Sequence, residues 1–269
     1  MALSDISLTS GMRANLLSLQ STVNLLNRTQ ERLSTGKKVN SPIDNPLNYF
    51  MAKSLTDRAS DISLAKDSMS EGIQTLKAGD AGIKAIDALI ASAKGIATSA
   101  LSATGSEVTS LQTQFNDILL QITNAADDSF YKGVNLLSAG GSLTVNLGDG
   151  SQLTVTGFGG DSTTLGISAA SAWSTSSGPI STSITQLETA TTTLRTQSKS
   201  LSSNLNIVII RQDFASTMIS TLSTGADNLT LADMNEEGAN MLMLQTRQAL
   251  STTALSLSAQ AAQSVLKLF

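Results

Sequence analysis

The sequence contains neither cysteine nor histidine among its 269 residues. Without cysteine the chain forms no disulfide and has no thiolate nucleophile. Without histidine it lacks the commonest general acid and base, and the usual zinc ligand sets are excluded as well. We therefore expect no catalytic residue, no metal and no cofactor.

Aromatic residues and long apolar runs are also scarce. Only 3% of the residues are aromatic, whereas 41% are hydrophobic, and much of that fraction is alanine, which favours close helix packing. No run of about 18 apolar residues is present, so we expect no membrane span. A net charge of −4 without a basic cluster argues against nucleic acid as a partner. Residues 1–20 show no cleavable signal, which leaves a cytosolic location or export by a route without such a signal.

The longest pattern is a seven-residue repeat between Ile180 and Leu222. Such a repeat places one narrow apolar seam along a helix and is typical of a coiled coil. A helix of this length is about 65 Å long and needs other long helices beside it. The apolar seam consists of Ile180, Ile184, Leu187, Leu194, Leu201, Leu205, Val208, Ala215, Ile219 and Leu222.

Similar repeats predict four further helices. One covers residues 12–33 and ends before Gly36, and a second covers residues 55–93 and is broken at residues 104–106. A third, shorter helix covers residues 111–122. The last begins at Asp233, three residues before Glu236, in a pattern that resembles a capping box.

The middle of the chain has a different character. Residues 143–147 and 153–156 alternate between apolar and polar around Gly148-Asp149-Gly150, which predicts a β-hairpin. Residues 161–177 are polar and irregular apart from Trp173, so we expect a solvated loop. Residues 225–228, which begin with glycine, are expected to interrupt the long helix.

These patterns together predict a mainly α protein. We expect an elongated coiled-coil helical rod, with the N- and C-terminal helices paired and a small β-hairpin region in the centre of the sequence. Three parts are predicted: residues 1–42 with 226–269 as an inner terminal-helix domain, 43–138 with 179–225 as a helical rod domain, and 139–178 as a small surface segment of β-structure and loop.

Three stretches resemble the conserved ends of bacterial flagellins, and in particular the short alphaproteobacterial type. They are residues 31–41 (ERLSTGKKVNS), 228–240 (NLTLADMNEEGAN) and 261–269 (AAQSVLKLF). The likeness covers about residues 1–138 and 179–269, in the same order and spacing. It implies a structural subunit that polymerises into the extracellular flagellar filament for swimming motility. It also implies secretion through the flagellar export machinery, and contacts with an export chaperone and with hook-junction and cap proteins.

The resemblance also implies that the terminal helices form the innermost tube of the polymer. Two helices alone bury too few side chains to offset the entropy lost on ordering about 40 residues at each end. We therefore expect these ends to be disordered in the monomer and ordered in the assembly. The predicted assembly seam comprises Leu16, Leu19, Val23, Leu26, Leu33, Leu250, Ala254, Leu257, Ala261 and Leu268.

The central segment faces solvent in the family, and many flagellins carry O-linked sugars there. Candidate sites, with an unmodified solvated loop as the alternative, are Ser162, Thr163, Thr164, Ser174, Thr175, Ser176 and Ser177.

Two other functions remain open from the sequence. A hook–filament junction protein shares the terminal helix pattern, and a surface adhesin could bind carbohydrate through residues 133–178. The acidic pairs Asp127-Asp128 and Glu236-Glu237 are interpreted as solvated charges at a turn and a helix start rather than as catalytic carboxylates.

Overall fold

The computed structural model describes residues 10–266, with side chains described to residue 264. Within that range the chain is mainly α-helical, as predicted. The helices are α1 (Ser10–Thr35), α2 (Pro46–Ala100), α3 (Ser106–Asp127), α4 (Gly178–Thr230) and α5 (Met234–Leu266). The strands are β1 (Phe130–Tyr131), β2 (Val134–Asn135), β3 (Ser142–Gly148) and β4 (Ser151–Thr156).

The predicted seven-residue repeat is the buried face of α4. Every seventh residue from Ile180 to Leu222 is at most 7% exposed. The repeat of α2 is buried in the same way, from Ile62 to Ile90. The seams therefore form a core between long helices, as a coiled-coil pattern requires. The buried residues are Ile62, Met69, Leu76, Ile83 and Ile90 of α2, and Ile180, Leu187, Leu194, Leu201, Val208, Ala215 and Leu222 of α4.

The chain divides into two compact units. We name residues 1–57 with 222–269 the terminal unit and residues 58–221 the central unit. Because α2 and α4 cross the boundary, both helices contribute to both units. The three-part division by role stays a prediction.

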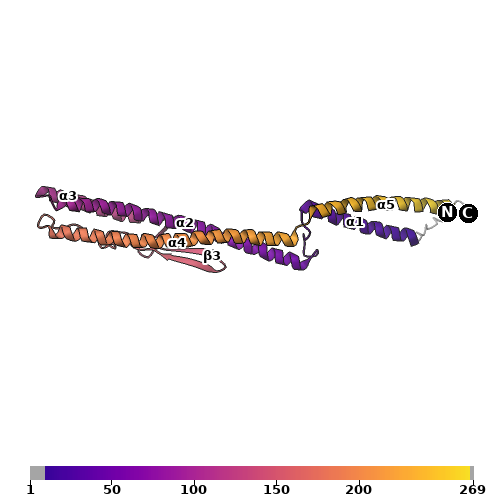
Figure 1. Cartoon of the computed structure of the whole chain (residues 1–269), viewed down its shortest axis with the longest axis horizontal. Helices are drawn as coiled ribbons and strands as arrows, with labels where there is room; N and C mark the ends of the chain where they lie inside the picture. The colour runs from indigo at the N-terminus through magenta and orange to yellow at the C-terminus, as the bar shows by residue number, and fades with distance from the viewer. Residues whose placement is uncertain (1–9, 267–269) are drawn as a thin grey trace, which may run out of the picture. The chain divides into compact units, whose positions relative to one another are not determined.

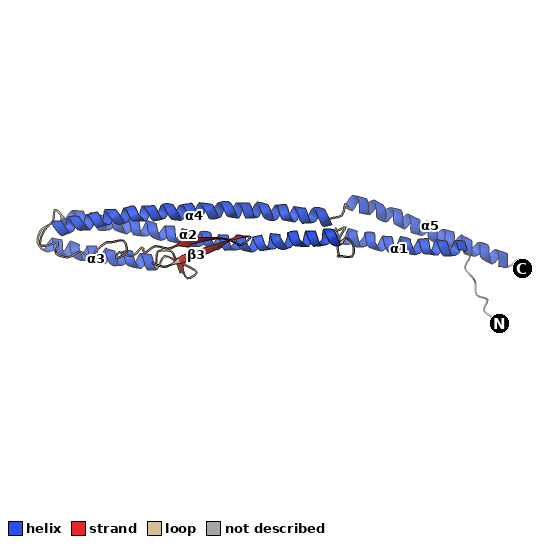
Figure 2. Cartoon of the chain, turned by 90° about the horizontal axis from the view of Figure 1, so that it is seen from below, coloured by secondary structure: helices blue, strands red, loops and turns tan. Residues whose placement is uncertain are grey.

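In the central unit, α2, α3 and α4 lie side by side (Figures 1 and 2). The predicted hairpin is confirmed: β3 and β4 pair antiparallel around a turn in which Gly148, Asp149 and Gly150 all have positive φ. The hairpin lies against α2, where the Asn146 N–H donates to Ser68 Oγ at 3.2 Å and Arg58 pairs with Asp149 at 2.9 Å.

Residues 161–177, which we name the strap, differ from the expected solvated loop. Trp173 is 2% exposed, and its ring centroid lies 4.8 Å from that of Phe115 on α3. Asn116 accepts from the Ala170 N–H at 2.7 Å and donates to the Ala170 carbonyl at 3.2 Å. The apolar residues of the strap are widely spaced among serines and threonines and follow no helix or strand period. The sequence pattern therefore did not predict this packing. The apolar residues buried in the strap are Leu165, Ile167, Ala170 and Trp173.

The expected interruption of the long helix at residues 225–228 is wrong, because α4 continues to Thr230. A Cβ on Gly225 would lie 3.4 Å from Leu55 Cδ1 of α2. Gly225 therefore lies inside a continuous α4, where a Cβ would meet Leu55 at about ordinary van der Waals distance.

In the terminal unit, α1 and α5 lie side by side (Figures 1 and 2). As predicted, α1 ends before Gly36, which has φ 69° and donates its N–H to the Arg32 carbonyl at 2.8 Å. The start of α5 after Asp233 is also confirmed. The Asp233 carboxylate accepts from the N–H groups of Asn235 and Glu236, at 2.8 and 3.3 Å.

Candidate assembly surface

The pairing of α1 with α5 buries few large side chains. The buried residues of the two helices are Thr22 and Thr29 on α1 and Glu237 and Leu244 on α5. A threonine on a helix satisfies its hydroxyl locally, as Thr22 does by donating to the Ser18 carbonyl at 2.8 Å. This is a thin core for two helices of 26 and 33 residues.

The predicted seam of α1 is only partly covered within the chain. Leu16 is 37% exposed, and the other predicted positions on this helix are half-buried. The half-buried residues are Leu19, Val23, Leu26 and Leu33.

The described residues of the predicted seam of α5 are all exposed. Leu250 is 67% exposed and Leu257 is 61% exposed, and Ala254 and Ala261 are also exposed. Leu268 lies outside the described residues. The less exposed face of α5 is a second repeat. Because this repeat contains polar residues, the sequence pattern did not predict that it would be the covered face. It consists of Leu244, Gln248, Ser251, Leu255, Ser258 and Ala262.

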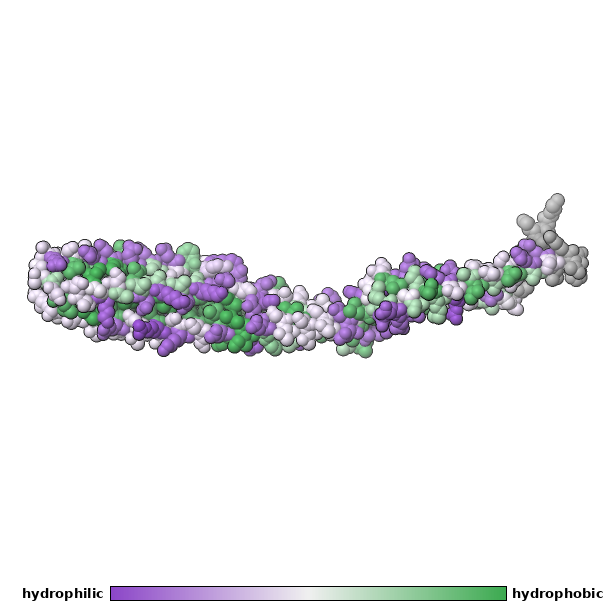
Figure 3. Space-filling view, turned by 45° about the horizontal axis from the view of Figure 1, so that its top comes forward, coloured by the Kyte–Doolittle hydropathy of each residue, from purple (hydrophilic) through white to green (hydrophobic). Residues whose placement is uncertain are grey.

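Further large apolar side chains of the terminal unit reach the surface. Hydrophobic residues, drawn green, appear along the terminal helices in Figure 3. Exposed apolar side chains in a stripe along a helix are unusual on a surface that stays in contact with water. Such a stripe is typical of an interaction surface. These residues are Leu17 (66% exposed) and Leu25 (43%) on α1, and Leu242 (67%) and Met243 (60%) on α5.

An ion pair between α1 and α5 was missed by the sequence interpretation. Arg32 Nη1 lies 2.8 Å from Glu237 Oε1, and the two side chains are 18% and 8% exposed. The interpretation of Glu237 as a solvated charge is therefore wrong, whereas its neighbour Glu236 is exposed as expected. The two charges are 205 positions apart, and only the packing of α1 on α5 brings them together.

A groove of about 350 Å³ lies between α1 and α5 beside this ion pair. Two more arginines, Arg28 and Arg247, line it together with the apolar residues Leu25, Met243 and Leu244.

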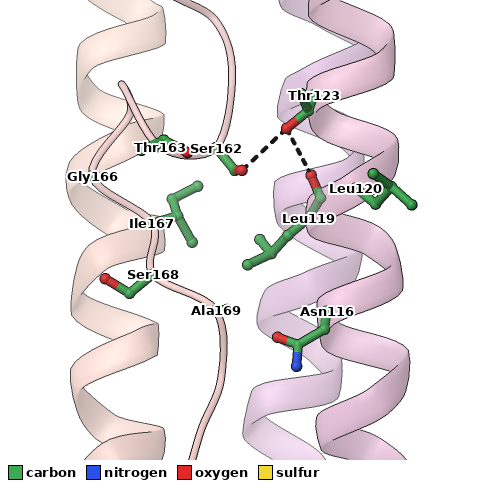
Figure 4. A pocket seen from close by; sticks show the side chains of 10 residues that line it. All are labelled: Asn116, Leu119, Leu120, Thr123, Ser162, Thr163, Gly166, Ile167, Ser168 and Ala169. Carbon is green, nitrogen blue, oxygen red and sulfur yellow. Dashed lines mark hydrogen bonds between the residues drawn. The ribbon is translucent and has the colours of Figure 1, made fainter.

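The predicted modification sites lie on the strap. Thr163 and Thr164 are exposed, as are residues 174–177, namely Ser174, Thr175, Ser176 and Ser177. Ser162 differs, because it is half-buried and its hydroxyl lies 3.1 Å from Thr123 Oγ1 of α3. Figure 4 shows this contact at the edge of a cavity of about 430 Å³ between the strap and α3.

Asp127 and Asp128 are exposed at the end of α3, as the sequence interpretation expected. Within the described residues, no three side chains of His, Cys, Asp or Glu are grouped so as to bind a metal. In the same part of the chain, no helix is long and apolar enough to cross a bilayer.

Comparison with known proteins identifies the chain's relatives. The bacterial flagellin N-terminal helical region matches residues 6–141. The chain is 34% identical to flagellin FljM of Caulobacter vibrioides over the whole of both chains, and 26% identical to the flagellin of Brucella melitensis over 94% of this chain and 95% of that one. The crystal structure of Bacillus cereus flagellin, 19% identical, superposes with a TM-score of 0.49 over 55% of this chain and 88% of that one. The full-length identity and the family match show that the chain belongs to the bacterial flagellins.

Proposed function

We propose that this chain is the structural subunit of a bacterial flagellar filament used for swimming and that it polymerises through its terminal unit. The observation that carries this proposal is the exposed apolar face of α5, where Leu250 is 67% exposed and Leu257 is 61% exposed among the residues that the structure describes. Burying one such side chain contributes about 1.5–3 kcal/mol, so neighbouring copies gain most of the missing core by covering it. In this arrangement residues 1–42 with 226–269 form the inner layer of the polymer.

The partners follow from membership of the family. The chain polymerises with itself and with other flagellins, and the product is extracellular. Our proposal adds secretion by the flagellar export machinery, with an export chaperone, the hook-junction proteins and the cap as further partners. It includes no enzymatic activity and no binding of nucleic acid or membrane.

The proposal also assigns the strap to the outer surface of the filament. The exposed hydroxyls of Thr163, Thr164 and residues 174–177 are then accessible to O-linked glycosylation. Ser162 is the weakest of the seven candidates because its hydroxyl already pairs with Thr123.

Neither alternative function has an observation in its favour. A hook–filament junction protein would share the terminal helices, but the full-length relatives are flagellins. An adhesin would present aromatic rings to a sugar, yet Trp173 is buried against Phe115.

Electron microscopy of purified protein tests the proposal. Long uniform filaments should form from the unaltered chain, and the double substitution L250S/L257S should prevent assembly while the helical circular dichroism signal is retained. A matched control is Leu64→Ser, which removes a 67% exposed leucine from the central unit. Assembly of L250S/L257S at the concentration that suffices for the unaltered chain would contradict this role of α5.

A further inference from the structure

An apolar projection in the terminal unit is largely exposed among the residues that the structure describes. Ile43 is 93% exposed, which is extreme for a β-branched aliphatic residue. It is followed by Leu47 (68% exposed), Phe50 (61%) and Met51 (48%) in the first turns of α2. Because Phe50 and Met51 are three and four residues after Leu47, the three share one helix face. We name Ile43, Leu47, Phe50 and Met51 the apolar knob.

The knob is held in place by its own turn. Asp44 Oδ2 accepts hydrogen bonds from the N–H groups of Asn40 and Ser41, at 3.1 and 3.0 Å, and from the Ser41 hydroxyl at 3.1 Å. Asn45 Oδ1 accepts from the Asn48 N–H at 3.1 Å and fixes the start of α2. A projection that is already ordered loses little conformational freedom on binding, so this turn favours Ile43 as a docking residue.

A mainly apolar depression, which could accept the apolar knob, lies on α5 of the same unit. It is a shallow depression of about 480 Å³, which we name the α5 trough. It borders the exposed seam, since Leu250 belongs to both, and it is therefore continuous with the proposed polymer interface. The residues that line it are Ala239, Leu242, Met243, Thr246, Arg247 and Leu250.

The knob and the trough also carry complementary charges. Asp44 is the only charged residue between Ser41 and Met51, and Arg247 is the only charged residue of the trough. Asp44 Oδ1 accepts no hydrogen bond from any residue that the structure describes. Arg247 likewise forms no ion pair within residues 10–266. The N–H groups of Ser41 and Asn40 hold the pKa of Asp44 below its usual value, and the positive charge of Arg28 lowers it as well.

We propose that the apolar knob of one copy of this chain docks into the α5 trough of a second copy, with Asp44 placed beside Arg247. Two different patches that fit one another form a heterologous contact, and such a contact repeats from copy to copy instead of closing a dimer. The inference rests on the proposed function and deepens it, because it names the residues that join one pair of neighbours.

Disulfide trapping tests the contact, and the absence of native cysteine makes it selective. Single variants Ile43→Cys and Met243→Cys are mixed in equal amounts, polymerised, and oxidised. We expect disulfide-linked dimers in the filaments and none in the unpolymerised mixture, because a disulfide requires Cα atoms about 4.4–6.8 Å apart. A parallel mixture of Ile43→Cys with Leu250→Cys samples the other end of the trough. In the control mixture, Leu64→Cys replaces the trough variant, and we expect only background dimer.

The outcomes separate this inference from the proposed function. If filaments form and neither trough variant yields more dimer than the Leu64→Cys control, the docking is wrong while the filament function stands. If the unaltered chain forms no filament, the proposed function fails and the inference with it.

A second measurement covers the case in which the cysteine variants assemble poorly. Ile43→Ser should raise the concentration needed for polymerisation by at least about tenfold, which corresponds to about 1.4 kcal/mol. Ile43→Val, which keeps most of the apolar surface, and Leu64→Ser should change it little. Because Ile43 is 93% exposed, neither substitution at this position disturbs packing within the chain. If Ile43→Ser polymerises at the same concentration as the unaltered chain, the proposal is wrong.

Discussion

At the residue scale, the pair of Arg32 and Glu237 is the strongest polar link between α1 and α5. Glu237→Ala leaves a largely buried guanidinium without its carboxylate, and losing a hydrogen bond to a charged group removes about 1.5–3 kcal/mol. We expect filaments of this variant to dissociate at a lower temperature than those of the unaltered chain, as followed by light scattering during heating. Glu237→Gln keeps a hydrogen-bond acceptor, so its filaments should dissociate at a temperature between those of Glu237→Ala and the unaltered chain.

The neighbouring glutamate provides the control for this prediction. Glu236 is exposed and has no ion pair within the described residues. Glu236→Ala should therefore shift the dissociation temperature little, in keeping with the small contribution of exposed charges. Equal shifts for Glu236→Ala and Glu237→Ala would show that the buried pair adds nothing to assembly.

At the element scale, the docking of the hairpin on α2 depends on a glycine. A Cβ on Gly72 would lie 2.5 Å from Val145 Cγ2 of β3, whereas one on Gly95 of the same helix would meet nothing within 4 Å. We expect Gly72→Ala to destabilise the chain by about 1–3 kcal/mol through overpacking. Gly95→Ala should stabilise it by about 0.8–1.0 kcal/mol, since it replaces a helix-interior glycine in open space. Thermal unfolding followed by circular dichroism measures both changes in stability. If the two substitutions shift the unfolding temperature in the same direction, this account is wrong.

The strap gives a second prediction at this scale. We expect intact-mass measurement of filament protein from the native organism to exceed the chain mass of 27.9 kDa by whole sugar units. Replacing the exposed candidate sites of the strap, Thr163, Thr164 and residues 174–177, with alanine should remove the added mass. A single native species at 27.9 kDa would mean that the strap is unmodified.

The sequence predicted those elements whose pattern is regular. The seven-residue repeats of α2 and α4 and the hairpin around Gly148 all follow from strict periodicity and local turn chemistry. The burial of the strap could not be predicted, because its apolar residues follow no helix or strand period; Trp173, for example, is buried against Phe115 of α3. The prediction at Gly225 was wrong because a glycine that ends a helix and one inside a continuous helix look alike in sequence.

The assembly surface was predictable only in part. Leucine spacing predicts a seam on α5 whose role in assembly stays a prediction, and the less exposed residues of the same helix include Ser251 and Ser258, which carry no apolar signal. The pairing of Arg32 with Glu237 was out of reach, since it depends on the register of two helices at opposite ends of the chain. In general, the sequence reveals which helix faces are apolar, and the packing decides which of them stays uncovered.

At the scale of the whole molecule, the two units are stabilised to different degrees. In the central unit α2 and α4 bury continuous seams, and the hairpin and the strap add Val145 and Trp173 to the same core. In the terminal unit α1 and α5 share a thin interface and leave Leu250 and Leu257 exposed. We therefore expect the central unit to fold alone and the terminal unit to be completed by contact with other copies, which would couple folding of the ends to assembly.

Deleting residues 233–269 tests that coupling. The deletion removes α5 and therefore the partner of α1, while the buried seams of α2 and α4 between residues 58 and 221 are untouched. We expect a soluble chain that keeps the helical circular dichroism signal of the central unit and forms no filaments by electron microscopy. In limited proteolysis, the monomer of the unaltered chain should lose both ends and retain a resistant core of about residues 45–225, because local stability follows the density of buried apolar contacts. Assembled filaments should protect the same ends. A monomer whose terminal helices resist protease as long as the central unit does would show that the ends fold without their neighbours.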